Sequence, residues 1–200
     1  MRTTDCLMGF AGHMIDDARR KIPRFPPSAE SGVRIAIRER LDRYRPKIAV
    51  SSAACGGDII FAEETINLGI PTYIILPFED NKEFERLSVA FAKKFWVKRF
   101  HKVLERAEKI FYVNPGGYES NKDFEENQHA IIFFCLGIQQ ILKIQIVNII
   151  LYDDLAPGDN PGGTRSFLEL CESLERLNFN LIHEKIDMAK VRSQILSIGK

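Results

Sequence analysis

Short apolar runs alternate with helical patterns along the whole chain, and this alternation restricts the possible folds more than any other feature. The runs are rich in Ile, Val, Phe and Tyr, as buried strands are. They lie at residues 6–11, 47–51, 72–76, 109–113, 146–152 and 179–183. Parallel strands need long crossovers, and a helix between two strands supplies one. The sequence therefore predicts an α/β, Rossmann-like, doubly wound fold, with a mostly parallel sheet flanked by helices on both faces.

The predicted helices occupy the intervals between these strands. Apolar residues recur at helical spacing after the prolines and serine at 26–28, and they continue through Tyr44. Further helical patterns lie at residues 58–68, 79–92, 96–107, 121–142 and 163–177. The pattern at 58–68 is followed by Gly69 and then Pro71, the usual order of residues at the end of a helix.

Length and composition favour one compact domain over residues 1–200. Hydrophobic residues make up 45% and charged residues 28%, which excludes a disordered, collagen-like or coiled-coil chain. The longest apolar run covers residues 130–138, whereas about 20 residues are needed to span a bilayer. The first residues do not resemble a secretory signal, so a cytoplasmic location is expected.

The net charge of +1, from 28 Lys and Arg against 27 Asp and Glu, gives no overall field for a polyanion. This balance argues against a nucleic-acid partner and against a membrane partner. Residues 93–102 do mix cations with aromatic residues, as single-stranded nucleic-acid platforms do. Helical spacing places Trp96 and Phe100 on one apolar stripe, so the cations are interpreted as a solvated face.

The sequence indicates neither a metal site nor a cofactor. The cysteines stand far apart without metal-ligand spacing, and we expect them to be buried and free: Cys6, Cys55, Cys135 and Cys171. Cys55 precedes a glycine pair at a predicted helix start, where a thiolate would be favoured. Asp153, Asp154 and Asp159 could attract a cation, but acidic residues are also common in turns and no metal is predicted.

Three predicted strand-to-helix loops are rich in glycine and polar residues, at 9–13, 51–58 and 158–164. Such loops lie at one edge of a parallel sheet, and their N–H groups can approach an anion closely. In the first two loops the candidate ligand-binding residues are Gly9, Gly12, His13, Ser51, Gly56, Gly57 and Asp58. Ordinary turns also use glycine pairs. His13 could be structural, and Asp58 could cap its helix instead of binding a ribose hydroxyl.

Other loop features narrow the ligand class. Neither a dinucleotide-binding glycine fingerprint nor a nucleoside-triphosphate P-loop is present. Arg19, Arg20 and Arg24 lie in the segment before the first predicted helix. These side chains could clamp a phosphate if the segment folds over the sheet edge, or they could be solvated loop charges.

Two motifs resemble those of the SLOG superfamily, which includes the Lonely Guy phosphoribohydrolases and DNA-processing protein A. One is the sequence at 51–64, followed by Gly-Ile-Pro at 69–71 and Ile-Leu-Pro-Phe at 75–78. The other, at 161–169, is similar to the Pro-Gly-Gly-x-Gly-Thr-x-x-Glu signature of the Lonely Guy branch. Phe10-Ala11-Gly12-His13 resembles the opening motif of a bacterial subgroup, and the resemblance runs from Gly9 to about Glu184.

The resemblance implies binding of a nucleotide or a nucleotide-derived signal, such as an ADP-ribose-like one, by a sensor or regulatory domain. Its alternative is a phosphoribohydrolase that cleaves nucleoside 5′-monophosphates, with Glu169 as the acidic catalytic residue. Single-stranded DNA binding is a third, less favoured interpretation. The implied ligand-binding residues of the second motif are Pro161, Gly162, Gly163, Thr164, Arg165 and Ser166. Arg165 stands where the signature has glycine, which leaves catalysis open. Family members often associate, which favours a homodimer, and the apolar stretch 131–138 could be an interior helix or part of a dimer face.

Overall fold

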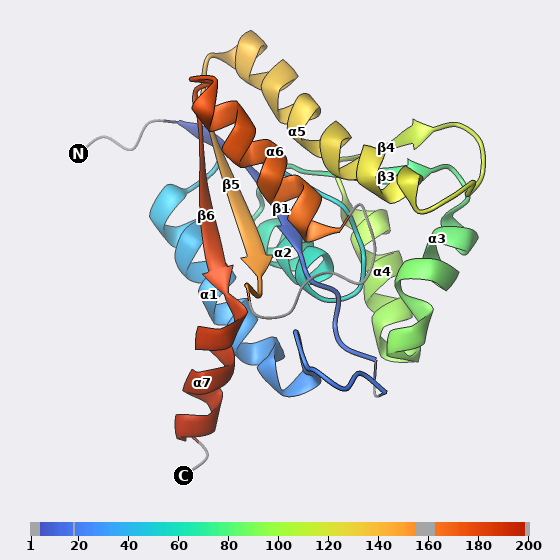
Figure 1. Cartoon of the computed structure of the whole chain (residues 1–200). Helices are drawn as coiled ribbons and strands as arrows, with labels where there is room; N and C mark the ends of the chain where they lie inside the picture. Colours follow the sequence, from blue (N-terminus) through green and yellow to red (C-terminus); the bar gives the residue numbers. More distant parts are fainter. Residues whose placement is uncertain (1–4, 18, 155–162, 199–200) are drawn as a thin grey trace.

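A computed structural model describes residues 5–17, 19–154 and 163–198. Its centre is a six-stranded parallel sheet with the order β4-β3-β2-β1-β5-β6 (Figure 1). The strands are β1 (Cys6–Gly12), β2 (Ile48–Ser51), β3 (Thr72–Phe78), β4 (Lys109–Asn114), β5 (Gln145–Tyr152) and β6 (Leu181–Asp187). The predicted doubly wound α/β fold is confirmed.

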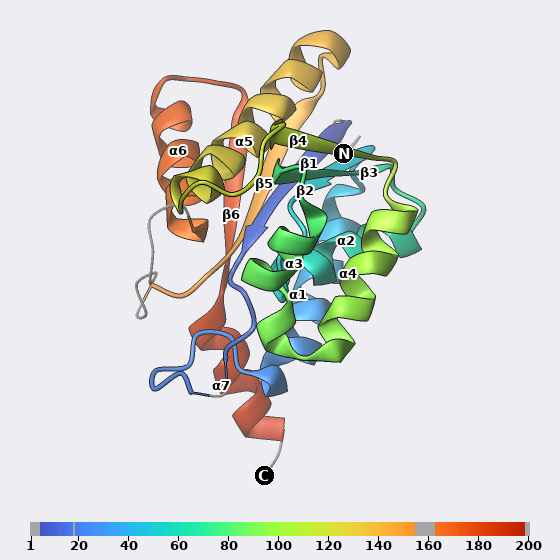
Figure 2. The same cartoon turned by 90° about the vertical axis from the view of Figure 1, so that its right-hand side faces the viewer.

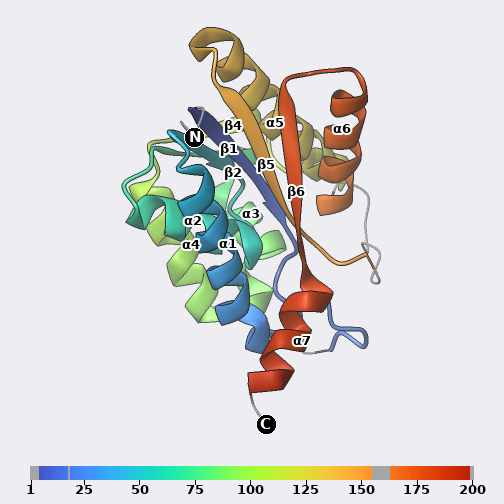
Figure 3. The ribbon, with the colours of Figure 1, turned by 90° about the vertical axis from the view of Figure 1, so that its left-hand side faces the viewer.

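Helices cover both faces of the sheet. One face carries α1 (Glu30–Tyr44), α2 (Gly57–Asn67), α3 (Asn81–Ser88) and α4 (Lys94–Arg106), and the other carries α5 (Lys122–Leu142) and α6 (Thr164–Arg176) (Figures 2 and 3). A last helix, α7 (Met188–Ile198), extends beyond the carboxyl end of β6. The single helix expected at 79–92 is instead α3 followed by the 3-10 turn η2 (Ala90–Ala92), and another such turn, η1 (Pro27–Ala29), precedes α1.

The strand order reverses between β1 and β5. From β1 to β4 the chain advances toward one edge of the sheet, with its crossover helices on one face. It then returns through α5 to place β5 on the other side of β1, in a register that pairs Gly9 with Asn148. In such sheets ligands bind at the carboxyl ends of the strands that flank this reversal. The fold therefore defines where a site should be sought.

Each face of the sheet buries its own apolar cluster. The rings of Phe10 and Phe61 stack at 4.6 Å in the cluster beneath α1, α2 and α4. All four cysteines are buried and free, as expected. The suggestion of a favoured thiolate at Cys55 is wrong, because burial raises the pKa of this thiol to about 12. No helix in the described part of the chain is long and apolar enough to cross a bilayer.

Candidate functional site

His13 joins the ends of the two strands at which the order reverses. Its backbone N–H donates to the Leu151 carbonyl at 3.1 Å, and its Nε2 accepts from the backbone N–H of Asp153 at 3.0 Å. The side chain is buried, and its ring lies 5.2 Å from that of Tyr152. Because Nε2 is an acceptor here, the neutral imidazole carries its proton on Nδ1. The structure thus brings His13 to the switch point between β1 and β5.

The glycines of the first two loops pack the end of β1 against the start of α2. The Gly57 N–H donates to the His13 carbonyl at 3.1 Å, and the Gly12 N–H donates to Asp58 Oδ1 at 3.0 Å. A Cβ added to Gly57 would lie 3.0 Å from the Gly12 Cα, so the two backbones touch where neither residue has a side chain. These two N–H groups are therefore bound within the chain, and the loops supply close packing.

Asp58 crosslinks this junction from the first turn of α2. Its carboxyl is buried and accepts the Gly12 N–H, from a residue 46 positions earlier in the chain. Burial raises the pKa of the Asp58 carboxyl to about 7, although backbone N–H groups of Gly12 and Ala54 oppose the increase. A buried carboxyl that titrates near neutrality makes the stability of this junction dependent on pH.

We expect the free energy of unfolding to fall as the pH rises from about 4 to 7, because the native state holds the Asp58 proton more tightly than the unfolded chain does. Asp58→Asn keeps an acceptor for the Gly12 N–H and cannot ionise. It should therefore flatten this slope and raise stability at pH 8 by an amount on the order of a few kcal/mol. Urea unfolding at several pH values measures both effects. Asp42→Asn, at an exposed position of α1, is the control, and an unchanged slope in Asp58→Asn would contradict the assignment.

Two other predicted site residues lie away from the loops. Gly9 is in the interior of β1, where an added Cβ would lie 2.2 Å from Asn148 Oδ1 on the neighbouring strand β5. Ser51 is the last residue of β2, fully buried, and its hydroxyl donates to the Ser52 carbonyl at 2.9 Å. Both positions are therefore buried within the sheet and not in the loops at its edge.

The start of α6 contributes the described part of the third predicted loop; Pro161 and Gly162 lie outside the described residues. Gly163 occupies the N-cap position, and no side chain caps the helix there. Thr164 is buried, and the Ser166 hydroxyl lies 3.4 Å from His129 Nε2 on α5. The amino end of α6 thus faces α5 with polar side chains and carries the partial positive charge of a helix terminus.

Arg165 and Glu169 pair with each other on the outer side of α6. The Arg165 Nε donates to Glu169 Oε1 at 2.8 Å, and both side chains are more than half exposed. Residues of α6 that face the sheet are instead Phe167, Leu168 and Cys171. Arg165, which stands where the Lonely Guy signature has glycine, is therefore paired with the carboxylate of Glu169, the predicted catalytic residue.

Asn127 of α5 is a candidate site residue that the sequence analysis missed. Its side chain is 2% exposed and its Nδ2 donates to Ser52 Oγ at 3.3 Å, just beyond the end of β2. Its Oδ1 is buried and has no hydrogen-bond partner among the described residues. Turning the amide round would leave the nitrogen unpaired instead, so one polar atom lacks a partner in either orientation. The adjacent Gln128 Oε1 is also buried and unpartnered.

The segment between β1 and α1 is held at the same edge by α7. Arg192 Nη1 donates to the Arg24 carbonyl at 2.7 Å and to Asp153 Oδ2 at 2.5 Å. Asp153, which could have attracted a cation, is thus buried against an arginine. Arg19 pairs with Asp17 in the segment itself. In the described part of the chain, no cluster of three or more His, Cys, Asp or Glu residues could hold a metal.

No protein-family model and no curated protein matches the sequence. Among solved structures, the chain is similar to DNA processing protein A from Helicobacter pylori, a structure described in terms of its single-stranded DNA binding mode. The two share 14% sequence identity with a TM-score of 0.40, and the match covers 98% of this chain and 80% of the other. The SLOG resemblance therefore stays a prediction.

This comparison corrects one expectation from the sequence. The balanced net charge was taken to make a nucleic-acid partner unlikely, and this comparison contradicts that expectation: the similar structure is described in terms of its single-stranded DNA binding mode. A net charge of +1 averages over the whole surface and does not report local clusters of cations. Nucleic acid therefore remains open as a class of partner.

Proposed function

We propose that this protein binds a nucleotide or a nucleotide-derived small molecule at the carboxyl edge of its sheet, next to the reversal of strand order. The observation that carries the proposal is the unpartnered amide oxygen of Asn127, buried at that edge while the amide nitrogen donates to Ser52 Oγ. A buried polar atom without a partner costs about 1–3 kcal/mol, and a ligand that supplies the partner removes this cost. Asn127 is thus poised to recognise a polar ligand.

The chemistry around Asn127 fits a nucleotide. The carbonyl oxygen of Asn127 accepts a hydrogen bond, which the amino groups of bases and the hydroxyls of ribose donate. The amino end of α6 has no side-chain cap and favours a negatively charged group such as phosphate. The amide oxygen of Asn127 on α5 would accept a hydrogen bond from the base or ribose, and the amino end of α6 would bind the phosphate. These two groups match the two ends of a nucleoside phosphate.

Asn127→Leu separates a binding role from a structural one. Leucine fills a similar volume and removes both the unpaired oxygen and the hydrogen bond to Ser52 Oγ. These two effects on stability oppose each other, so stability should change by about 1 kcal/mol or less, whereas nucleotide affinity should fall at least tenfold. Calorimetric titration with AMP, other nucleoside monophosphates, ADP-ribose and cyclic dinucleotides measures the affinity, and thermal unfolding measures the stability.

Gln139→Leu is the matched control on the same helix. Gln139 donates to the Asn180 carbonyl at the far end of α5, so its loss should leave nucleotide affinity unchanged. The proposal fails if no member of the panel binds the wild-type protein at high micromolar concentration. It also fails if Asn127→Leu binds the nucleotide as tightly as the wild type and the Gln139→Leu control do.

A further inference from the structure

We propose that a second, separate surface, formed by η2 and the outer side of α4, binds single-stranded nucleic acid. We call it the lysine–phenylalanine face. Its members are Phe91, Lys93, Lys94, Phe95, Lys98 and Lys102, all exposed. It lies on the helical layer opposite to α5 and α6, so it is distinct from the site at Asn127 (Figure 2).

The first line of evidence is a local excess of positive charge. Residues 86–104 contain six Lys and Arg and no Asp or Glu, in a chain whose net charge is only +1. Two other cations of this segment are already used, since Arg99 pairs with Glu63 and Glu30, and Arg86 pairs with Glu83. The side chains of the four lysines of the face have neither a hydrogen bond nor an ion pair within the part of the chain that the structure describes.

These lysines form a line that can follow a phosphate backbone. Lys94, Lys98 and Lys102 recur every fourth residue of α4 and therefore lie along one ridge. At a rise of 1.5 Å per residue the ridge is about 12 Å long. Phe95 lies three positions before Lys98 on the same side of the helix. Glu105, which is also exposed, follows beyond the end of the ridge.

The aromatic rings provide the second line of evidence. Trp96 and Phe100 are buried, as their helical spacing predicted, but Phe95 is 61% exposed and Phe91 is 38% exposed. The Arg99 guanidinium lies 5.2 Å from the centroid of the Phe95 ring, and Trp96 contacts the same ring edge-on. The Phe95 ring is thereby held in place while most of it faces solvent. Exposed rings among lysines are the combination on which unpaired bases stack.

The backbone at Lys93 provides a third observation. Its φ of 79° and ψ of 166° belong to a region that glycine occupies and residues with side chains rarely do. Glycine would relieve this strain, yet the position holds a lysine between Phe91 and Phe95. Strained residues concentrate at binding sites, where the side chain serves a purpose other than stability.

Fluorescence anisotropy with labelled oligothymidylate and oligouridylate of 20 nucleotides tests the proposal on the full chain, and the two probes distinguish DNA from RNA. Lys94→Ala/Lys98→Ala should weaken binding at least tenfold at low salt. It should also reduce the slope of log affinity against log salt by about 1.4, since each phosphate contact contributes about 0.7 on single strands. Phe95→Ala should weaken binding about fivefold or more, because a base loses its stacking partner.

Three controls keep the outcome decisive. Lys47→Ala/Lys190→Ala removes the same charge from other surfaces and should leave affinity within about twofold. Lys93→Gly should raise the melting temperature and weaken binding, a combination that a purely structural lysine would not give. Phe95→Leu keeps the apolar area without the aromatic face, so binding should fall as it does in Phe95→Ala.

Vesicles of phosphatidylserine and phosphatidylcholine test the competing membrane surface. The proposal is overturned if the wild-type protein binds these vesicles but neither oligonucleotide. It is also overturned if the two double-lysine variants lose oligonucleotide affinity equally, because the attraction would then be spread over the whole protein. Retained oligonucleotide binding in Phe95→Leu together with Phe95→Ala would contradict the stacking role.

Discussion

Gly56→Ala is expected to destabilise the protein by about 4 kcal/mol, a large share of the stability of a typical domain. Gly56 has φ 106° and ψ −125°, a conformation that residues with a Cβ avoid. An added Cβ would also lie 2.5 Å from the Ile15 nitrogen and 2.8 Å from the His13 carbonyl oxygen. Both are backbone atoms, so the clash is relieved only by moving the junction between β1 and α2.

Gly69→Ala is the matched control, because Gly69 also has a positive φ, of 72°, but its Cβ would meet no atom within 4 Å. The backbone penalty alone then applies, and about 1 kcal/mol is expected. Guanidinium unfolding of the two variants separates strain from collision. Equal losses in both would show that the packing of Gly56 against His13 and Ile15 contributes nothing.

The fold could be predicted because each local signal agreed with the global architecture. Buried parallel strands need continuous apolar runs, and all six strands of the sheet begin within two residues of their predicted starts. The elements at the end of the chain, β6 and α7, were more difficult to predict from the sequence. Asp187 accepts the N–H of Ala189 and so marks the start of α7, but the strand β6 before it has few buried residues. Because of this weak pattern, the sequence analysis ended the last strand at residue 183 and predicted no helix after it.

The site was only partly predictable, since the sequence locates a loop without showing what its N–H groups bind. Gly12 and Gly57 are in the predicted loops, but their N–H groups are taken up by Asp58 and by the His13 carbonyl. These contacts join residues more than 40 positions apart and depend on the packing of β1 against α2. Asn127 did leave a signal. It shares a helical ridge with Ile131 and Cys135, and a polar residue on such a buried ridge needs a partner.

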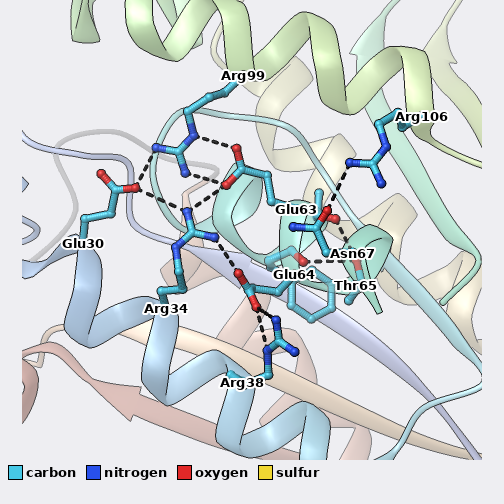
Figure 4. A network of polar contacts seen from close by, with 11 residues as sticks. Glu30, Arg34, Arg38, Glu63, Glu64, Thr65, Asn67, Arg99 and Arg106 are labelled. Carbon is cyan, nitrogen blue, oxygen red and sulfur yellow. Dashed lines mark hydrogen bonds and ion pairs between the residues drawn. The ribbon is translucent and has the colours of Figure 1, made fainter. Parts of the chain in front are cut away.

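A network of three arginines and three glutamates joins α1, α2 and α4 (Figure 4). Its members are Glu30, Arg34, Arg38, Glu63, Glu64 and Arg99. Arg99 is 8% exposed, binds Glu63 through Nε and Nη2 at 2.7 Å each, and reaches Glu30 at 2.8 Å. Its guanidinium also lies 3.9 Å from the centroid of the Trp96 ring. Equal numbers of the two charges make the network neutral, so removing one member leaves a charge uncompensated.

Arg99→Met is therefore expected to destabilise the fold by about 3 kcal/mol, because Glu63 and Glu30 stay partly buried with fewer partners. Arg86→Met, which breaks the exposed pair with Glu83 on α3, should have no measurable effect. The double variant Arg99→Met/Glu63→Gln should recover part of the loss, since it removes the unpaired charge as well. Urea unfolding of the four proteins measures these differences, and an Arg99→Met variant as stable as Arg86→Met would show that the network does not hold the helices.

The pH dependence of Arg99→Met distinguishes lost charge pairing from lost packing. Burial alone would raise the pKa of Glu63, but the hydrogen bonds from Arg99 and Arg34 outweigh it and hold that pKa below its ordinary value of 4.5. A carboxyl with a lowered pKa stabilises the native state above pH 4.5, and this contribution disappears as the pH falls through the native pKa. The difference in stability between Arg99→Met and the wild type should therefore be largest at neutral pH and should become smaller as the pH falls. A difference between the two proteins that stays constant with pH would assign the loss to the packing of Arg99 against Trp96.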